Sequence, residues 1–181
     1  MNIKEYLGKM KGGAKSPPSV KFYEILWAGL GSAIGIFVLG YLSAKYFNPI
    51  GLTLFIGSFG ASAVLVYAAI KSPLAQPRNL IGGHIISAVV GVASYQLFGH
   101  FIIIAASVAV SFAIMSMLAT KTLHPPGGAT ALIAVIGGKG IYKLGYLYAL
   151  IPVGLGAAVL LIIALIVNNL SENRKYPEYW L

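Results

Sequence analysis

The sequence contains no aspartate and no cysteine, and acidic residues are scarce throughout. The only acids are Glu5, Glu24, Glu172 and Glu178, all near the two ends of the chain. Cation pathways and proton relays inside membranes usually depend on buried Asp or Glu, so this sequence disfavours cation transport by carboxylates. Without cysteine there are no disulfides and no thiolate metal sites, and we expect neither a metal nor another cofactor.

What the sequence has in abundance is apolar side chains. Hydrophobic residues make up 58% and charged residues only 9% of the 181 residues, and the mean hydropathy is +0.84. Soluble domains carry about 25% charged residues, so a water-soluble fold is excluded. The net charge of +9 fits either nucleic acid or an anionic membrane surface. Because the charges lie between apolar runs, we expect lipid as a partner and no nucleic acid.

The apolar runs predict several membrane-spanning helices, since a bilayer core of about 30 Å requires roughly twenty residues. Two further runs are interrupted by glycine, serine or proline and predict broken half-helices. The plain spans are about 23–44, 83–98, 101–119 and 144–167, and the broken segments are about 50–70 and 121–138.

The two broken segments resemble each other. Gly60-Ala61-Ser62-Ala63-Val64-Leu65 aligns with Gly128-Ala129-Thr130-Ala131-Leu132-Ile133 at an offset of 68 residues. Small residues are common in membrane helices, so chance similarity is one reading. The other reading is an internal duplication, in which helix, broken segment and helix occur twice.

The distribution of Lys and Arg distinguishes two topologies, because cytoplasmic loops are enriched in these residues. If both broken segments cross, ten of the 13 basic residues lie inside and three, Lys45, Lys139 and Lys143, lie outside. If the segments re-enter instead, the ratio is seven to six. We therefore predict an all-α membrane protein with about six segments in two inverted three-segment repeats, 23–98 and 101–167. A basic segment, 1–22, precedes them and a tail, 168–181, follows, both cytoplasmic.

This topology places the N-termini of both half-helices near the middle of the membrane. Helix N-termini carry free N–H groups and partial positive charge, and they bind anions without an ionised side chain. The alternative is close helix packing, for which small residues and proline are equally suited. The residues predicted to bind the anion are Gly57, Ser58, Gly60, Ala61, Ser62, His124, Gly127, Gly128, Ala129 and Thr130.

Four polar residues flank the apolar runs. His84 and His124 are each able to hydrogen-bond an anion or to carry a proton, although a single His at a helix end is more often a cap. Arg78 and Lys121 are candidates for attracting or gating the anion at the inner mouth, and the alternative for both is a topological or snorkelling role.

The segment from His124 to Leu132, with the sequence HPPGGATAL, resembles the signature for which the HPP family of integral membrane proteins is named. The stretches 57–65 and 72–84 and the closing Tyr176-Pro177 with Trp180 are similar to the same family, so the likeness covers about residues 23–180. Members in cyanobacteria and chloroplasts are associated with nitrite transport. The family is usually described with four spans, whereas the charge distribution favours six crossings.

These observations predict a transporter or channel for a small inorganic anion, with nitrite as the first candidate, in the plasma or inner membrane. The alternative is a membrane binding or assembly module with a basic inner face. The sequence has no motif of a catalytic site, and we expect no enzymatic activity. Six short helices bury little surface, so a homo-oligomer is expected.

Overall fold

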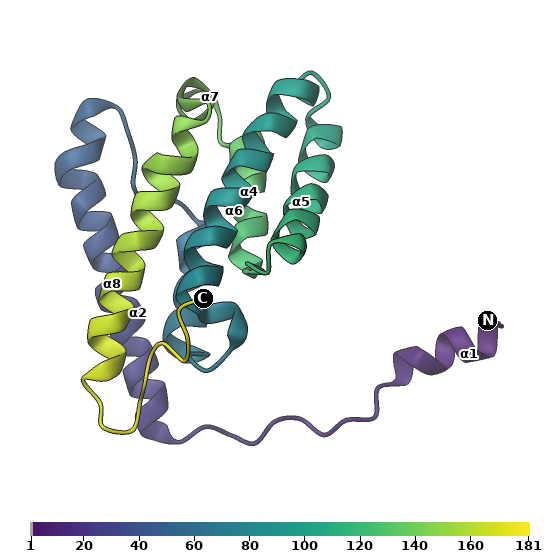
Figure 1. Ribbon diagram of the computed structural model, residues 1–181, viewed down its shortest axis with the longest axis vertical. Helices are drawn as coiled ribbons and strands as arrows, with labels where there is room; N and C mark the ends of the chain where they lie inside the picture. Colours follow the sequence, from purple (N-terminus) through teal and green to yellow (C-terminus); the bar gives the residue numbers. More distant parts are fainter. Residues whose placement is uncertain (1) are drawn as a thin grey trace.

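The computed structural model describes residues 2–181, and within that range the chain is helical with no β-strand (Figure 1). Four helices are long and apolar enough to cross a membrane. The first is α2, Phe22–Leu42, which continues through η2, Ser43–Phe47, and η3, Asn48–Ile50. The others are α4, Pro77–Phe98, α5, Ile102–Ala119, and η6, Ala149–Gly154, with α8, Leu155–Asn169.

Two shorter apolar helices lie between the long ones. The first is α3, Ser58–Ala63, which continues as the π-helical turn η4, Val64–Ala68, after a non-helical approach over 51–57. The second is α6, Pro125–Ile136, whose first two positions are prolines with backbone angles already suited to a helix start. Helices of 11 or 12 residues are about 18 Å long or less, so neither crosses a bilayer core alone.

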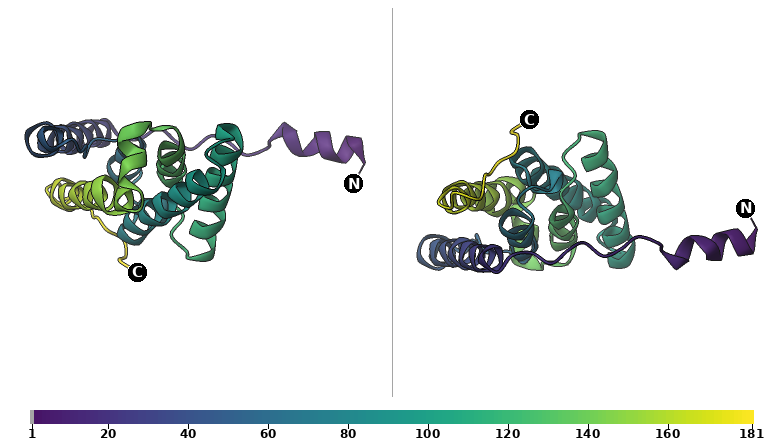
Figure 2. Two further views of the ribbon diagram at one scale, coloured as in Figure 1. Left: turned by 90° about the horizontal axis from the view of Figure 1, so that it is seen from above. Right: turned by 90° about the horizontal axis from the view of Figure 1, so that it is seen from below.

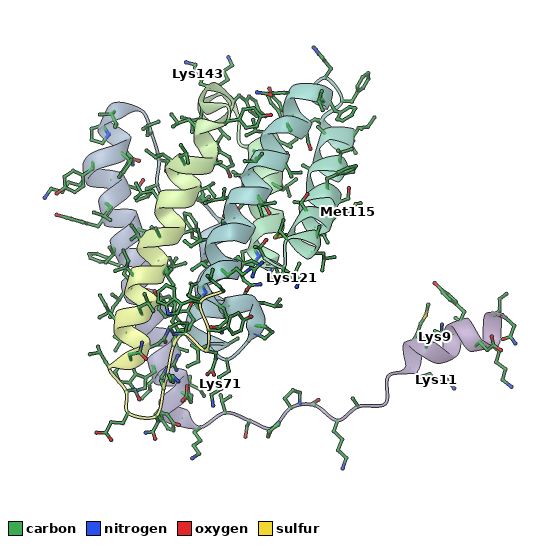
Figure 3. All side chains as sticks on the ribbon, in the orientation of Figure 1. Lys9, Lys11, Lys71, Met115, Lys121 and Lys143 are labelled. Carbon is green, nitrogen blue, oxygen red and sulfur yellow. The ribbon has the colours of Figure 1, made fainter. Side chains whose placement is uncertain are left out.

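The remaining elements are short. The N-terminal helix α1, Ile3–Gly8, and the turn η1, Lys9–Lys11, are exposed and project away from the other helices (Figures 1 and 2). The turn η5, Pro73–Ala75, precedes α4, and α7, Lys139–Leu144, follows α6. Figure 3 shows Lys71 and Lys143 at opposite ends of the bundle.

Small residues allow α4, α5 and α6 to pack closely. Three alanines spaced by four residues, Ala105, Ala109 and Ala113, form one fully buried face of α5 and cluster with Ala131 of α6. On α4, a Cβ added at Gly91 would lie 2.6 Å from the carbonyl oxygen of Ala131. Membrane helices associate through such contacts because apolar burial alone gives little driving force in lipid.

Two of the predicted spans have different bounds in the structure. The predicted span 83–98 is a 22-residue helix that begins six residues earlier, at Pro77. Its polar first turn is stabilised by Arg78 and Asn79, which donate to the carbonyl oxygens of Thr120 and Leu123. The predicted span 144–167 is not continuous, because Ile151 has extended backbone angles before Pro152, whose missing N–H interrupts the helix.

The C-terminal tail is bound to the bundle at the end where α2 begins. Arg174, almost fully buried, forms an ion pair with Glu24 at 2.6 Å and donates to the carbonyl oxygen of Tyr67 and to Asn168 Oδ1. Tyr176 donates to the carbonyl oxygen of Ala75 at 2.6 Å. The tail therefore holds the end of η4 and the loop after it.

Candidate functional site

The two short helices contact each other through polar side chains. Thr130 Oγ1 lies 2.9 Å from Ser58 Oγ, and His124 Nε2 lies 2.9 Å from Ser62 Oγ. Ser62, which comes later in α3 than Ser58, thus pairs with His124, which comes earlier than Thr130. The helices consequently run antiparallel, with their N-terminal turns overlapping by about one turn.

His84 of α4 joins these pairs into one cluster. Its Nε2 lies 2.7 Å from Ser62 Oγ, and its Nδ1 lies 2.7 Å from Thr130 Oγ1. On the other side, His124 Nδ1 lies 2.8 Å from the carbonyl oxygen of Leu74. We call the set Ser58, Ser62, His84, His124 and Thr130 the polar cluster.

The polar cluster is shielded from the surroundings. Ser58 is 1% exposed and the other four side chains are 0% exposed. The two imidazole rings lie 5.0 Å apart, and the Phe59 ring meets His84 edge-on at 5.2 Å. Tyr148 closes the cluster at Thr130, to whose carbonyl oxygen it donates at 3.1 Å. These groups donate and accept hydrogen bonds without a carboxylate or an ammonium group, which suits a ligand that carries its own negative charge.

Glycines on α4 make room for this arrangement. A Cβ at Gly83 would lie 2.6 Å from the His124 Cβ and 2.7 Å from the carbonyl oxygen of Thr122. A side chain at this position would therefore push the N-terminal end of α6 away from α4. Gly82 approaches Thr122 in the same way, with a Cβ distance of 2.7 Å to Thr122 Cγ2.

The backbone donors at the two helix starts are largely engaged within the chain. The N–H groups of Phe59 and Gly60 donate to the carbonyl oxygens of Ile56 and Gly57, and that of Gly127 donates to His124. Pro125 and Pro126 have no N–H to offer. At the contact between α3 and α6, an anion would therefore meet donors from the side chains of the polar cluster more than from the backbone.

The remaining predicted site residues lie outside the polar cluster. Gly57, Gly60, Ala61 and Ala129 are exposed on the surface of the bundle. Gly127 is enclosed, with an added Cβ only 2.6 Å from Ser87 Oγ, and Gly128 is partly buried.

The two basic residues predicted at the inner mouth are engaged differently. Arg78 donates to the carbonyl oxygen of Thr120 at 2.9 Å and so fixes the loop before α6. Lys121 is exposed and has a φ of 57°, in the left-handed region that non-glycine residues rarely adopt. Lys121 lies on the connection that leads to His124, and Arg78 contacts this connection from the first turn of α4.

Two contributors to the site were not predicted from the sequence. Leu74 acts through its backbone carbonyl oxygen, for which a side-chain pattern gives no signal. Tyr148 lies in a stretch that reads as part of a plain span, and in the structure it contacts Thr130 just before the break at Ile151. Both become visible only through the tertiary packing of distant segments.

Cavities lie at both ends of the bundle and beside α3. A cavity of about 560 Å³ is lined by Tyr23, Glu24, Lys71 and Ser72 among others, at the end bound by the tail. A smaller one, about 230 Å³, lies at the opposite end between 51–53 and 137–144. A third, about 500 Å³, separates α2 from the exposed face of α3 at Gly60 and Val64.

The comparisons place the chain among membrane proteins. Residues 17–177 match the family described as HPP, transmembrane region. Two transmembrane proteins of Dictyostelium discoideum are 46% and 45% identical to the chain over 179 and 182 residues, which is 97% and 98% of this chain. The chain spans 57% and 62% of the length of these relatives. No solved structure matches. The chain belongs to the HPP transmembrane family.

Proposed function

We propose that this protein transports a small inorganic anion, with nitrite as the first candidate, along the contact between α3 and α6. The observation that carries the proposal is the polar cluster itself, a buried set of hydroxyl and imidazole groups where two short helices meet. Buried polar groups in membrane helices are costly to place and mark substrate pathways.

The absence of acids inside the bundle supports an anionic substrate. Glu24 lies at the bundle end and is paired with Arg174, and the other three acids are outside the long helices. An anion at the polar cluster therefore meets hydrogen-bond donors and no opposing carboxylate. The association of cyanobacterial and chloroplast members of the HPP family with nitrite transport supports this choice of first candidate.

The cavities suggest a path. The outer one, near Gly51 and Gly137, lies where the non-helical approach 51–57 begins, and this approach leads directly to Ser58. The inner one includes Lys71 and Ser72, in the loop that supplies the Leu74 carbonyl oxygen. In this proposal the polar cluster closes the route between the two cavities, and transport requires it to open.

We further propose the overall arrangement that the sequence predicted. The antiparallel contact of α3 and α6 supports two inverted three-segment repeats. The ion pair between Glu24 and Arg174 brings the start of α2 and the tail to one end, which supports both segments lying on the same side of the membrane. The distribution of Lys and Arg favours the cytoplasmic side of a cell membrane. The exposed small residues of α3 offer a face for a second copy in a homodimer.

The test is anion flux into liposomes that contain the purified protein. We expect nitrite to enter down its gradient faster than into protein-free liposomes, and Thr130→Val to lower this flux at least tenfold, because it removes a hydroxyl that contacts both Ser58 and His84. The matched control is Ser87→Ala, which removes a buried α4 hydroxyl whose contact is Met117 Sδ at 3.5 Å. Absence of flux for nitrite, nitrate, formate and halide would contradict the proposal.

The exposed N-terminal segment favours one alternative, a binding or assembly module. Its lysines, including Lys9 and Lys11, project away from the bundle (Figure 3), and basic segments of this kind attract anionic lipid headgroups. This alternative expects no anion flux. It also expects that neutralising Lys11, Lys15 and Lys21 has a larger effect than Thr130→Val.

A further inference from the structure

The polar cluster is a continuous chain of hydrogen bonds. It begins at the N-terminal turn of α3, passes through α6 and α4 and returns to α3. From there it continues through His124, directly before α6, and ends at Leu74 in η5, at the tail-bound end of the bundle. Its five links have heavy-atom distances of 2.7–2.9 Å. In order, the chain is Ser58 Oγ, Thr130 Oγ1, His84 Nδ1 and Nε2, Ser62 Oγ, His124 Nε2 and Nδ1, and the Leu74 carbonyl oxygen.

The acceptors at its two ends determine where the hydrogens lie. The Leu74 carbonyl oxygen only accepts, so His124 Nδ1 carries a hydrogen. Thr130 donates its single hydroxyl hydrogen to Ser58 Oγ, so His84 Nδ1 must donate to Thr130. Both Nε2 atoms then face Ser62, which has one hydrogen for two imidazoles. One additional proton, making either imidazole an imidazolium, satisfies every link.

A second arrangement needs no additional proton. If the Thr130 hydroxyl turns from Ser58 Oγ to His84 Nδ1, Thr130 donates to that nitrogen, and the bond between Thr130 and Ser58 is given up. His84 Nε2 then donates to Ser62, and Ser62 donates to His124 Nε2, with both imidazoles neutral. The two arrangements differ by one proton and by the orientation of the Thr130 hydroxyl, so the same five side chains are able to accept and release a proton.

We propose that the polar cluster is a proton relay, in which Ser62 passes a proton between His84 and His124 and couples proton movement to the anion. The proposal rests on the proposed transport function and adds the proton as a second transported species. A proton from the Ser58 and Thr130 side bonds to His84 Nδ1 and makes His84 an imidazolium. The Nε2 proton of His84 moves to Ser62 Oγ while the Ser62 hydroxyl proton moves to His124 Nε2.

These transfers conserve charge and leave His84 neutral and His124 positive. The Nδ1 proton of His124 then leaves toward the inner cavity beside Lys71 and Ser72. The Leu74 carbonyl oxygen has no proton to return, so release requires its loop to move away from His124. Proton release and opening of the inner route are therefore the same event in this scheme. Rotation of the hydroxyls and exchange of the imidazole tautomers reset the chain.

The groups that face the relay carry no fixed charge. From α3 these are Ser58, Ser62 and the Phe59 ring, from α6 Thr130, and from the start of η6 Tyr148, which donates to the Thr130 carbonyl oxygen. Among residues 2–181, no hydrogen bond or ion pair brings an acid, lysine or arginine side chain onto the cluster. The nearest bases in sequence are Lys121, which is exposed, and Arg78, which is held on the Thr120 carbonyl oxygen. An imidazolium here is therefore balanced best by the transported anion.

The decisive experiment measures proton and nitrite entry together in liposomes that contain the protein and a trapped pH indicator. Nitrous acid crosses lipid unaided, so the signal from protein-free liposomes at the same neutral pH is subtracted. We expect the lumen to acidify as nitrite enters, and an imposed membrane potential to leave nitrite flux unchanged. In Ser62→Ala we expect proton entry to fall at least tenfold, whereas Ser62→Thr, which keeps the hydroxyl, retains it.

Ser87→Ala is the control for loss of a buried hydroxyl, and helix content by circular dichroism checks that each variant is folded. If folded Ser62→Ala takes up protons at the wild-type rate, the relay is overturned. Nitrite entry without proton entry in the wild type also overturns the relay and leaves the transport function standing. Potential-driven proton entry that requires Ser62, without any anion flux, supports the relay and contradicts the transport function. If a variant does not fold, the relay is tested by the NMR chemical shifts of the His84 and His124 ring nitrogens in the wild type. Two neutral imidazoles at every pH where the protein is folded contradict the relay.

Discussion

The two short helices share a sequence motif and differ in their surroundings. Helix α6 is a regular α-helix of 12 residues whose Ala131 backbone lies close to Gly91 of α4. Helix α3 has six α-helical residues followed by a π-helical turn, and two of the larger cavities lie against it at Gly60 and Ala68. Single π-helical turns are frequent at functional sites. From this comparison we infer that α6 is the fixed wall of the candidate site and that α3 is the element with room to move.

The difference extends to how each helix end is held. The end of α3 is bound by the C-terminal tail, because Arg174 donates to the Tyr67 carbonyl oxygen and pairs with Glu24. Helix α6 ends at Gly137, whose N–H donates to the Ile133 carbonyl oxygen within the same helix. Removing the tail contact should therefore loosen α3 and leave α6 in place.

The largest effect is expected from Arg174→Leu. It leaves the Glu24 carboxylate and Asn168 Oδ1 without the Arg174 donor, and loss of one member of a buried ion pair costs about 3–5 kcal/mol. Because Glu24 is 29% exposed, we expect a loss of about 3 kcal/mol at the lower end of that range. The measurement is chemical unfolding in detergent, with Lys175→Leu as the exposed neighbouring control. Equal stability of the two variants would show that the tail does not hold α3.

A smaller effect is expected from glycine substitutions that compare the two helices directly. In Gly91→Ala the new Cβ meets the backbone of Ala131 at 2.6–2.8 Å, and overpacking of this kind costs about 1–3 kcal/mol. In Gly60→Ala the Cβ meets nothing within 4 Å, so we expect no loss, or a gain of up to about 1 kcal/mol from helix propensity. Thermal unfolding midpoints in detergent test both. A Gly60→Ala variant less stable than Gly91→Ala would reverse the assignment of wall and mobile element.

The sequence predicted the helical class, the approximate long spans and the two short helices because these depend on local patterns. Runs of apolar residues specify membrane helices, and proline and glycine mark the starts of α3 and α6. The bounds of α4 were not predictable in this way. Its polar first turn is helical because Arg78 and Asn79 find carbonyl partners on the loop before α6, and that loop is 42–44 residues distant in sequence.

The site was predictable in part for the same reason. Ser58, Ser62, His124 and Thr130 were predicted as site residues from their places next to helix breaks, and His84 from its place at the start of a span. The sequence did not indicate that these residues form one chain of hydrogen bonds. The exposed position of Gly60 was also not predictable, since glycine is equally common at close contacts and at open faces. The sequence predicted the tail only as a cytoplasmic segment and gave no sign that Arg174 contacts Tyr67, which is 107 residues away.

The most direct test of a joint role for α3 and α6 is a double-mutant cycle on nitrite flux in liposomes. The variants are Ser58→Ala on α3, Thr130→Val on α6, and the two combined. The two hydroxyls share one hydrogen bond at 2.9 Å. We therefore expect each single change to lower flux at least tenfold, about 1.4 kcal/mol, and the double variant to be little slower than the worse single one. Single changes that leave flux intact, or effects that simply multiply, would contradict a shared site at this contact.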